Sequence, residues 1–335
     1  MTLISRAPVR ISFGGGGTDL ASYYEKHGGM VISASINKYF YTILEMREDD
    51  RIQIISSDLQ LSQTVRDFYH LKLGEGLDIP VAVLKHFNIQ RGMNLFMASE
   101  VPPGTGLGSS GTVCVNLVNL FNSLEHMKMT KQEIAEIAYK VGHDDLSMPI
   151  GKQDEYAASF GGLNVFHFTK DGVTVEPLDL SREVRKRLEE DVMLFFTGRT
   201  RDSSKILSCQ DKGGKDDEDV VVSSLHNIKK LGYEIKDAIS EGDLRKFGEL
   251  MGMAWESKKK LAKGITNERI DGLYKIAMEK GALGAKLTGA GGGGYLMLFC
   301  EKPNQKAVRD ALSAQGLKPM DFKFDMHGAK IIGGD

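Results

Sequence analysis

The sequence is poor in cysteine, with three among its 335 residues: Cys114, Cys209 and Cys300. They lie far apart and form no CxxC pair, so they predict neither a disulfide framework nor a zinc site. An excess of charge of one sign is also missing, because 43 Lys and Arg stand against 45 Asp and Glu, for a formal net charge of −2. This balance gives no electrostatic reason to expect a nucleic-acid partner.

Long apolar runs are missing as well. No run approaches the ~20 residues that span a bilayer, so we expect no membrane partner. The N-terminal stretch MTLISRAPVRISF lacks a basic segment followed by a long apolar one, and it does not have the pattern of a signal peptide. Together with the low cysteine content, these absences predict a protein of the reducing cytoplasm.

Glycine, by contrast, is abundant: the chain has 38 glycines and only 8 prolines. The glycines concentrate at 14–17, 104–111 and 289–294. The first group stands in RISFGGGGTDL (10–20), directly after a short apolar run. Four consecutive glycines lose much chain entropy on folding, so we expect a ligand or another part of the chain close to that backbone.

The apolar pattern predicts a strand-rich first half and a more helical second half. Stretches rich in β-branched and aromatic residues predict strands at 31–47, 51–58, 94–102, 191–198, 294–300 and 320–325. Helical spacing predicts helices at 109–124, 217–240, 242–262, 268–280 and 304–315. Hairpins outnumber strand–helix–strand units, so we expect an α+β fold with mainly antiparallel strands. A compositional change near 185–190 divides the chain into expected domains 1–188 and 189–335.

The second glycine group, VPPGTGLGSSGTVCVNL (101–117), lies between a predicted strand and a predicted helix. Unpaired N–H groups and the helix dipole attract anions at such a point, and glycine lets a phosphate approach the backbone. No Lys-Ser/Thr follows the last glycine, so this is not a Walker A loop. The GxGxxG sequence pattern fits both 106–111 and 289–294. Only one of the two could form the first turn of a dinucleotide-binding fold, so the pattern is weak evidence for such a fold. We therefore predict phosphate binding at 104–111, where Ser109 and Ser110 offer hydroxyls to Mg²⁺.

Three segments in chain order resemble one superfamily of kinases. They are APVRISFGGGGTDL (7–20), PPGTGLGSSGT (102–112) and KLTGAGGGGYLML (286–298). In these three motifs the chain resembles the GHMP kinases, which include galactokinase, homoserine kinase, mevalonate kinase and phosphomevalonate kinase. The three motifs are spread over almost the whole chain.

Within that superfamily, the first motif resembles the sugar-kinase form. An arginine, Arg10, is followed by Thr18 and Asp19, whereas mevalonate-type kinases carry a lysine and a Gly-Glu-His. Residues 151–164 and 196–207 resemble the sugar-1-kinase subgroup typified by D-glycero-D-manno-heptose 7-phosphate kinase. The exact sugar is left open by these residues.

The resemblance implies an N-terminal ribosomal-protein-S5-domain-2-like α/β domain and a C-terminal ferredoxin-like α+β domain. ATP and substrate would bind in the cleft between them, with the ATP phosphates on the second glycine group and Ser110 as a ligand of Mg²⁺. The residues expected to bind ATP are Pro103, Gly104, Thr105, Gly106, Leu107, Gly108, Ser109, Ser110 and Gly111.

By the same resemblance, Asp154 matches the catalytic aspartate, which accepts the proton of the attacking hydroxyl. Arg10 is expected to hold Asp154 ionised and to stabilise the transferring phosphoryl group. A second, acidic Mg²⁺ ligand is usual about ten residues before the catalytic aspartate. Related sequences have a glutamate there; Asp144 is the nearest candidate in this chain, with Asp145 and His143 as rivals.

The substrate pocket is expected around the first and third glycine groups. Asp19 would accept hydrogen bonds from sugar hydroxyls, and Lys152 and Arg201 are candidate cations for a substrate phosphate. The residues expected to bind substrate are Gly16, Gly17, Thr18, Asp19, Lys152, Arg201, Gly291 and Gly292.

The resemblance thus predicts an ATP- and Mg²⁺-dependent kinase that phosphorylates a sugar hydroxyl. The favoured acceptor is O1 of D-glycero-D-manno-heptose 7-phosphate or of a related sugar, so the expected partner is a small-molecule sugar or sugar phosphate. Two alternatives stay open: another GHMP enzyme, such as galactokinase, L-fucokinase or a mevalonate-type kinase, and a non-catalytic sugar or ATP sensor. A homodimer is also left open.

Overall fold

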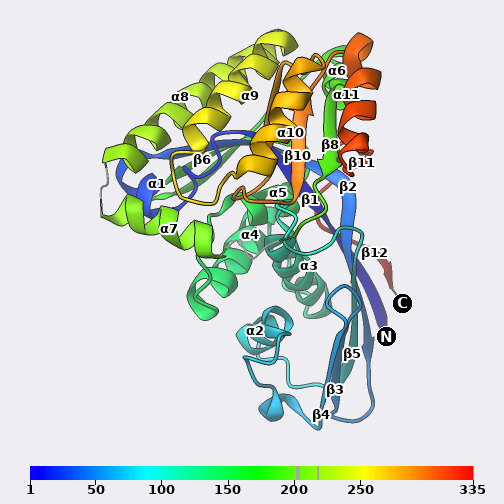
Figure 1. Cartoon of the computed structure of the whole chain (residues 1–335). Coiled ribbons are helices and arrows are strands. Elements are labelled where there is room, and N and C mark those ends of the chain that lie inside the picture. The colour runs from blue at the N-terminus through cyan, green and yellow to red at the C-terminus, as the bar shows by residue number, and fades with distance from the viewer. Residues whose placement is uncertain (201–203, 217–218, 335) are drawn as a thin grey trace.

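The computed structural model describes residues 1–200, 204–216 and 219–334. The fold is organised around two long antiparallel strands, β1 (Thr2–Gly14) and β2 (Gly29–Met46) (Figure 1). β1 alternates between buried and half-buried residues up to Arg6 and is buried throughout from Ala7 to Gly14. Other elements therefore cover one face of its first half and both faces of its second half.

β1 and β2 belong to an eight-stranded sheet with the order β12-β1-β2-β5-β3-β4, in which β6 also pairs with β2 and β7 pairs with β6. The other strands of this sheet are β3 (Ile52–Ser56), β4 (Leu61–Val65), β5 (Met93–Ser99), β6 (Leu163–Thr169), β7 (Gly172–Pro177) and β12 (Lys330–Gly334). The expectation of mainly antiparallel pairing is confirmed, since of these pairs β3 and β5 alone are parallel. Their crossover contains β4, the 3-10 turn Phe68–His70 and α2 (Asp78–His86).

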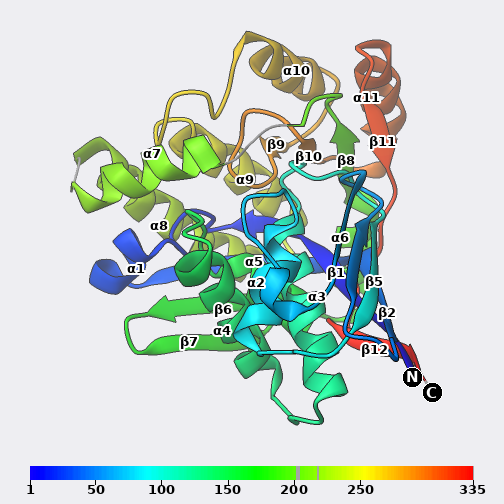
Figure 2. The ribbon, with the colours of Figure 1, turned by 90° about the horizontal axis from the view of Figure 1, so that it is seen from below.

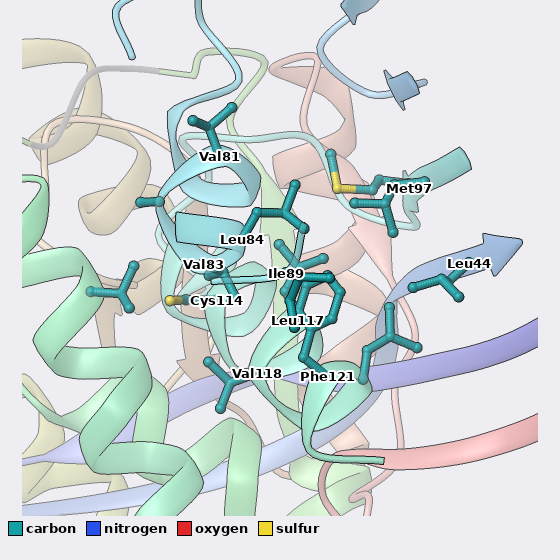
Figure 3. Packing of buried hydrophobic residues seen from close by; sticks show 14 of the residues in the cluster. Leu44, Val81, Val83, Leu84, Ile89, Met97, Cys114, Leu117, Val118 and Phe121 are labelled. Carbon is teal, nitrogen blue, oxygen red and sulfur yellow. The ribbon is translucent and has the colours of Figure 1, made fainter. Parts of the chain in front are cut away.

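Helix α3 (Ser109–Leu124) packs against β1 and β2 and is the centre of the first core (Figure 3). Its residues Leu117 and Phe121 are fully buried, together with Val81 and Leu84 of α2. The neighbouring helices are α4 (Lys131–Lys140), followed by a π-helical turn (Val141–Asp145), and α5 (Gln153–Phe160). This packing fixes the start of α3, and with it the end of the second glycine group, on the first sheet.

A second sheet of four strands has the order β11-β8-β10-β9. Its strands are β8 (Val192–Phe196), β9 (Gly284–Leu287), β10 (Tyr295–Phe299) and β11 (Lys318–Met320). The helices of this half are α6 (Arg182–Asp191), α8 (Asp219–Glu241), α9 (Leu244–Lys258), α10 (Glu268–Glu279) and α11 (Lys302–Ala314). Two more helices, α1 (Ala21–His27) and α7 (Ser204–Lys215), lie side by side at the edge of the molecule (Figure 2). Among the described helices, none is both long and apolar enough to span a bilayer.

The two sheets share one buried cluster, which contains Ile11 of β1, Leu194 of β8 and Phe247 of α9. The rings of Phe13 and Phe247 meet edge to face with centroids 5.3 Å apart. The chain also returns to its start, because β12 pairs with β1 and the two termini lie close together (Figure 1). The predicted division after residue 188 falls inside α6, just before β8, and stays a prediction.

Several predicted elements can be compared with the structure. The helix at 109–124 is confirmed with both its bounds as α3. The strand predicted at 320–325 is wrong: β11 ends at Met320, and Phe324 forms only an isolated bridge with Ile36. The reason is that the chain leaves the second sheet here and crosses to β2, where Asn37 N–H donates to the Lys323 carbonyl at 2.8 Å.

Candidate active site

The second glycine group connects β5 to α3 through a loop that requires glycine at several positions. Gly104, Gly106 and Gly108 have φ angles of 70°, 79° and 81°, in the left-handed region. Gly108 immediately precedes the first turn of α3. The loop therefore ends at a helix N-terminus, where backbone N–H groups and the helix dipole favour an anion.

Asp154, the second residue of α5, lies against this helix start. A Cβ added at Gly111 would come within 2.7 Å of the Asp154 Cβ, and one at Gly108 within 3.1 Å of the Asp154 Cγ. A side chain at Gly111 would therefore displace Asp154, and one at Gly108 would crowd its carboxyl group, so glycine at both positions lets Asp154 lie close to the backbone.

Arg10 binds Asp154 across the site. Its Nε donates to Asp154 Oδ1 at 2.8 Å, a terminal nitrogen donates to the same oxygen at 2.5 Å, and the other donates to the Gly106 carbonyl at 2.7 Å. Arg10 is 3% exposed. The two residues predicted to be catalytic are thus joined directly, although 144 positions separate them in the sequence.

A cavity of about 280 Å³ opens in front of this pair. Its described lining comes from β1, from all three glycine groups, from the segment 148–151 and the start of α5, from α7 and from the end of α9. The predicted residues that line it are Arg10, Gly17, Asp19, Gly104, Gly106, Gly108, Ser109, Ser110, Gly111 and Asp154. The structure therefore brings the predicted catalytic pair, most of the predicted phosphate loop and part of the predicted sugar pocket to one place.

The first glycine group is a tight turn that places Asp19 in this cavity. A Cβ at Gly15 would lie 1.9 Å from the Met30 carbonyl oxygen, so the turn packs on the start of β2. Asp19 is 3% exposed and accepts hydrogen bonds from the Gly17 N–H at 2.9 Å and the Gln153 N–H at 3.4 Å. Burial, followed by the nearby Asp154 carboxylate, raises the pKa of Asp19.

Thr18 and Gly16 belong to the turn but do not line the cavity. The Thr18 hydroxyl is fully buried, lies 2.8 Å from the carbonyl oxygens of both Gly15 and Met30, and accepts from the Met30 N–H at 3.0 Å. Thr18 therefore holds the turn together, and a direct substrate contact from either residue stays a prediction.

Two other predicted residues are engaged elsewhere. Lys152 Nζ pairs with Glu136 Oε2 at 3.0 Å and lies 5.0 Å from the centre of the Tyr139 ring. Asp144 pairs with His143 at 2.8 Å, and its side chain is 56% exposed. Neither Lys152 nor Asp144 lines the cavity in this structure, so their roles toward substrate phosphate and Mg²⁺ stay predictions.

The remaining predicted residues have mainly supporting positions. Thr105 and Leu107 are fully buried, and the Thr105 carbonyl accepts from the N–H of Tyr295, which joins the loop to β10. Gly291 and Gly292 belong to the loop before β10, where Gly292 N–H donates to the Ile265 carbonyl at 2.6 Å. Arg201 lies outside the described residues.

Glu155 is a cavity residue that sequence reasoning missed. It is 1% exposed, and its Oε2 has no hydrogen-bond partner. Burial, followed by the Asp154 carboxylate, raises the pKa of Glu155 well above its ordinary value. Its position directly after Asp154 was the one signal in the sequence, but only the packing of α5 against α3 shows that it faces the cavity.

Gln210 and Lys258 were also missed, and both lie far from the glycine motifs in the sequence. Gln210 of α7 donates through Nε2 to the Gly17 carbonyl at 3.3 Å, so α7 covers the first glycine group. Lys258, the last residue of α9, is 8% exposed and donates through Nζ to the Gly289 carbonyl. Helical spacing alone gave no reason to single out either side chain.

A second, more apolar cavity of about 490 Å³ meets the first at Ser109 and Ser110. Its lining includes Pro103, Leu77 of the segment before α2 and Val113 of α3. The start of α3 is therefore accessible from two sides: a polar cavity that holds Asp19 and Asp154, and an apolar one that holds none of the predicted catalytic groups.

The oxygen atoms at the start of α3 fit a hard divalent cation. Ser109 Oγ and Glu155 Oε2 are both buried without a hydrogen-bond partner, and Ser110 lines the same cavity. Mg²⁺ prefers oxygen ligands and is usually held by few protein atoms together with phosphate oxygens and water. The residues present are thus compatible with Mg²⁺ bound beside a nucleotide.

Comparisons with known proteins agree with this geometry. Two family models match the chain, GHMP kinases N terminal domain over residues 77–162 and GHMP kinases C terminal over 235–318. The D-glycero-alpha-D-manno-heptose 7-phosphate kinase of Campylobacter jejuni subsp. jejuni is 31% identical over 335 residues, which cover 98% of both chains. The chain belongs to the GHMP kinases.

This GHMP kinase also matches solved structures along its whole length. The crystal structure of a D-glycero-D-manno-heptose 1-phosphate kinase from Bacteroides thetaiotaomicron superposes with a TM-score of 0.83 at 27% identity and covers 100% of both chains. Lactococcus lactis galactokinase complexed with galactose superposes with a TM-score of 0.77 at 21% identity, over 99% of this chain and 95% of that one. The predicted family and the GHMP kinase fold are confirmed.

Proposed function

We propose that this GHMP kinase transfers the γ-phosphoryl group of ATP to a sugar hydroxyl. The observation that carries the proposal is the Arg10–Asp154 pair, which lies against the glycine loop and on the wall of the cavity. Phosphoryl transfer requires mainly positioning and positive charge around the moving group. The loop, the start of α3 and Arg10 provide these features in one place.

Asp154 acts as the proton acceptor in this proposal. Both guanidinium hydrogen bonds from Arg10 go to Oδ1, so Oδ2 is left to take the proton. The sugar oxygen forms a bond to the γ-phosphorus, the bond from that phosphorus to the bridging oxygen breaks, and ADP leaves. The hydroxyl proton passes to Asp154, and Arg10 stabilises the negative charge on the phosphoryl oxygens.

Ser110 would hold Mg²⁺ together with the ATP phosphates, with Asp144 or Glu155 as the acidic ligand. When bound, the metal neutralises charge on the phosphate oxygens. The chain's own contribution is a pair of buried oxygens at the start of α3, Ser109 Oγ and Glu155 Oε2, that have no hydrogen-bond partner within the protein.

The apolar cavity that meets the loop at Ser109 and Ser110 is the place we propose for the nucleobase. Its walls, which include Leu77 and Val113, offer apolar contacts to a flat aromatic ring. The phosphates would then run along the loop toward Asp154, and the acceptor sugar would occupy the polar cavity beside Asp19.

For the acceptor we propose a heptose 7-phosphate, phosphorylated at the anomeric O1. The support is the 31% identity to the Campylobacter jejuni heptose 7-phosphate kinase over 98% of both chains. The Pyrococcus furiosus galactokinase matches at 25% identity over 95% of this chain, so a free hexose is the second candidate. A cytoplasmic location and a homodimer stay predictions.

A coupled assay of ADP release tests the proposed function. Purified protein with ATP and Mg²⁺ is offered D-glycero-D-manno-heptose 7-phosphate, the unphosphorylated heptose, galactose, L-fucose and mevalonate. We expect the highest kcat/KM with the heptose 7-phosphate. Turnover of mevalonate alone would contradict the sugar acceptor, and ATP binding without turnover of any acceptor would favour a sensor.

A further inference from the structure

The outer face of the first sheet carries exposed apolar side chains where a solvated face usually carries polar ones. Ile43 of β2 and Phe96 of β5 are 38% and 43% exposed. The residues beside them in the two strands, Leu44 and Leu95, are 0% and 1% exposed, because they belong to the first core. An antiparallel sheet with one face in water normally alternates apolar and polar residues. Here the outward positions are apolar as well.

The exposed residues belong to one continuous row across four strands. In the strand register, Ile4 of β1 pairs with Ile43, and Ile43 pairs with Phe96. Phe96 in turn pairs with Ile55 of β3. Gly333 of β12 ends the row beside Ile4, and a Cβ built there would come within 3.3 Å of Ile4 Cδ1. Directly paired side chains lie about 5 Å apart, so Ile4, Ile43, Phe96 and Ile55 form one apolar stripe, the Ile43 row.

The helices of this half lie on the other face of the sheet. α3 packs on β1 and β2 from the core side, and in Figure 1 no described helix lies on the outer side of β5, β3 and β4. The six strands from β12 to β4 are about 4.8 Å apart, which makes the outer face about 25 Å wide. A standard protein interface buries about 800 Å² per partner, and a square of that area is about 28 Å across. The face is therefore large enough to bind another protein, and its apolar row is typical of such a surface.

The two rows next to the Ile43 row differ in charge. On one side, the row that contains the exposed Glu45 has a carboxylate and no cation among its described residues. On the other side, Arg6 of β1 pairs with Lys330 of β12 and Tyr41 of β2, so this row has two cations and no described carboxylate. The Arg6 guanidinium also stacks on the Tyr39 ring, 4.1 Å from its centre. Arginine and tyrosine are enriched in protein interfaces.

We propose that a second copy of this chain packs on the Ile43 row and forms a homodimer whose twofold axis runs along that row. Sheets that pack face to face lie about 10 Å apart with nearly aligned strands. With this axis, Ile43 and Phe96 each meet their own counterpart, and the Glu45 row of each copy lies over the Arg6 row of the other. An axis along the strands would instead place each charged row over itself. Opposite charges therefore favour the axis along the Ile43 row.

The first test is sedimentation velocity of the purified chain without nucleotide or sugar. Wild type is compared with Ile43→Lys, with Phe96→Thr and with the control Met253→Lys, at a site 56% exposed on α9. We expect wild type and the control to be dimers. Ile43→Lys should raise the dissociation constant of the dimer by about tenfold or more, because two lysines would face each other across the axis. Phe96→Thr removes the ring but keeps a residue that favours a strand, and it should also weaken the dimer.

Charge exchange tests the direction of the axis. Glu45→Arg and Arg6→Glu should each weaken the dimer, and the double variant should restore most of the loss, because the exchanged charges again lie opposite each other. Within one chain Arg6 pairs with Tyr41, and Glu45 lies four residues farther along β2, at about 13 Å. A contact inside one chain therefore does not account for the rescue.

Three results would overturn the inference: a wild type that is a monomer at every concentration measured, a dimer that neither Ile43→Lys nor Phe96→Thr weakens, or single charge variants that the double variant does not rescue. Circular dichroism checks that each variant is folded; if Ile43→Lys does not fold, Phe96→Thr and the charge variants decide. None of these measurements involves ATP or a sugar, so failure of the kinase proposal and failure of this one are read from different experiments.

Discussion

The carboxylate of Asp19 lies directly against the α-carbon of Gly151. A Cβ built on Gly151 would lie 2.1 Å from Asp19 Oδ2, and the Lys152 N–H donates to the Asp19 carbonyl at 3.3 Å. The first glycine group and the segment that leads into α5 are thereby locked together. This contact sets the position of the one acidic side chain that the first motif presents to the cavity.

Gly151→Ala should therefore weaken mainly the binding of the acceptor sugar. The methyl group displaces the Asp19 carboxylate, so we expect the KM for the sugar to rise by about tenfold or more, as for the loss of a hydrogen bond to a charged group. The KM for ATP should change much less. Steady-state kinetics with each substrate varied in turn measure both values, and Asp19→Ala should show the same split.

Gly272→Ala is the matched control for that substitution. Gly272 lies in α10, and a Cβ added there would meet nothing within 4 Å. Alanine at this position should leave both KM values unchanged and stabilise the fold by up to about 1 kcal/mol. If Gly151→Ala raised the KM for ATP more than that for the sugar, the assignment of Asp19 to the acceptor would be wrong.

Asp154→Asn should lower kcat by about 10²- to 10⁴-fold, because the amide keeps the shape of the side chain but cannot accept the proton. ATP binding, measured by calorimetry, should stay within a few-fold of wild type. Asp171→Asn, an exposed substitution in the turn between β6 and β7, serves as the control. Undiminished turnover of Asp154→Asn would remove Asp154 as the base.

Glu155→Gln should change how stability depends on pH. The raised pKa of Glu155 means that the folded chain holds this proton more tightly than the unfolded chain does. As pH rises above the ordinary pKa of a glutamate, the wild type therefore loses free energy of unfolding, while Glu155→Gln does not. Burial is the main cause of the raised pKa of Glu155; the Asp154 and Asp19 carboxylates add to it, and Arg10 opposes it.

Urea denaturation of wild type and Glu155→Gln at pH 5 and pH 8 measures this effect. The stability of the variant relative to wild type should increase between the two pH values. An unchanged or decreasing difference would show that Glu155 is ionised in the folded chain without penalty.

Phe247→Ala should weaken the packing between the two sheets. Phe247 is fully buried in the shared core, against Phe13 of β1 and Phe299 of β10. Loss of its ring should lower the free energy of unfolding by about 3–5 kcal/mol. Met253→Ala on the same helix, at a site 56% exposed, should have little effect on the same denaturation curve. Equal losses for the two variants would contradict a shared core centred on Phe247.

The local part of the fold follows from the sequence. The apolar spacing of 109–124 is enough to define α3, because a helix with one buried face needs that spacing wherever it packs. The strand expected at 320–325 failed because a short apolar segment does not reveal which sheet edge it will meet. The pairing of β12 with β1 was not predicted either, since pairing between the two ends of a chain leaves no local signal in the sequence.

For the site, the motifs predicted the chemistry: phosphate binding at 104–111, a catalytic carboxylate at Asp154 and an arginine at position 10. The resemblance also led us to expect that Arg10 holds Asp154, and the structure joins the two side chains. Tertiary structure alone decided that Thr18 bonds within its own turn, that Lys152 pairs with Glu136, and that Glu155 and Lys258 line the cavity. The physical reason is that backbone conformation and helix spacing are local properties of a sequence. The direction in which a buried side chain faces depends instead on which distant segment packs against it.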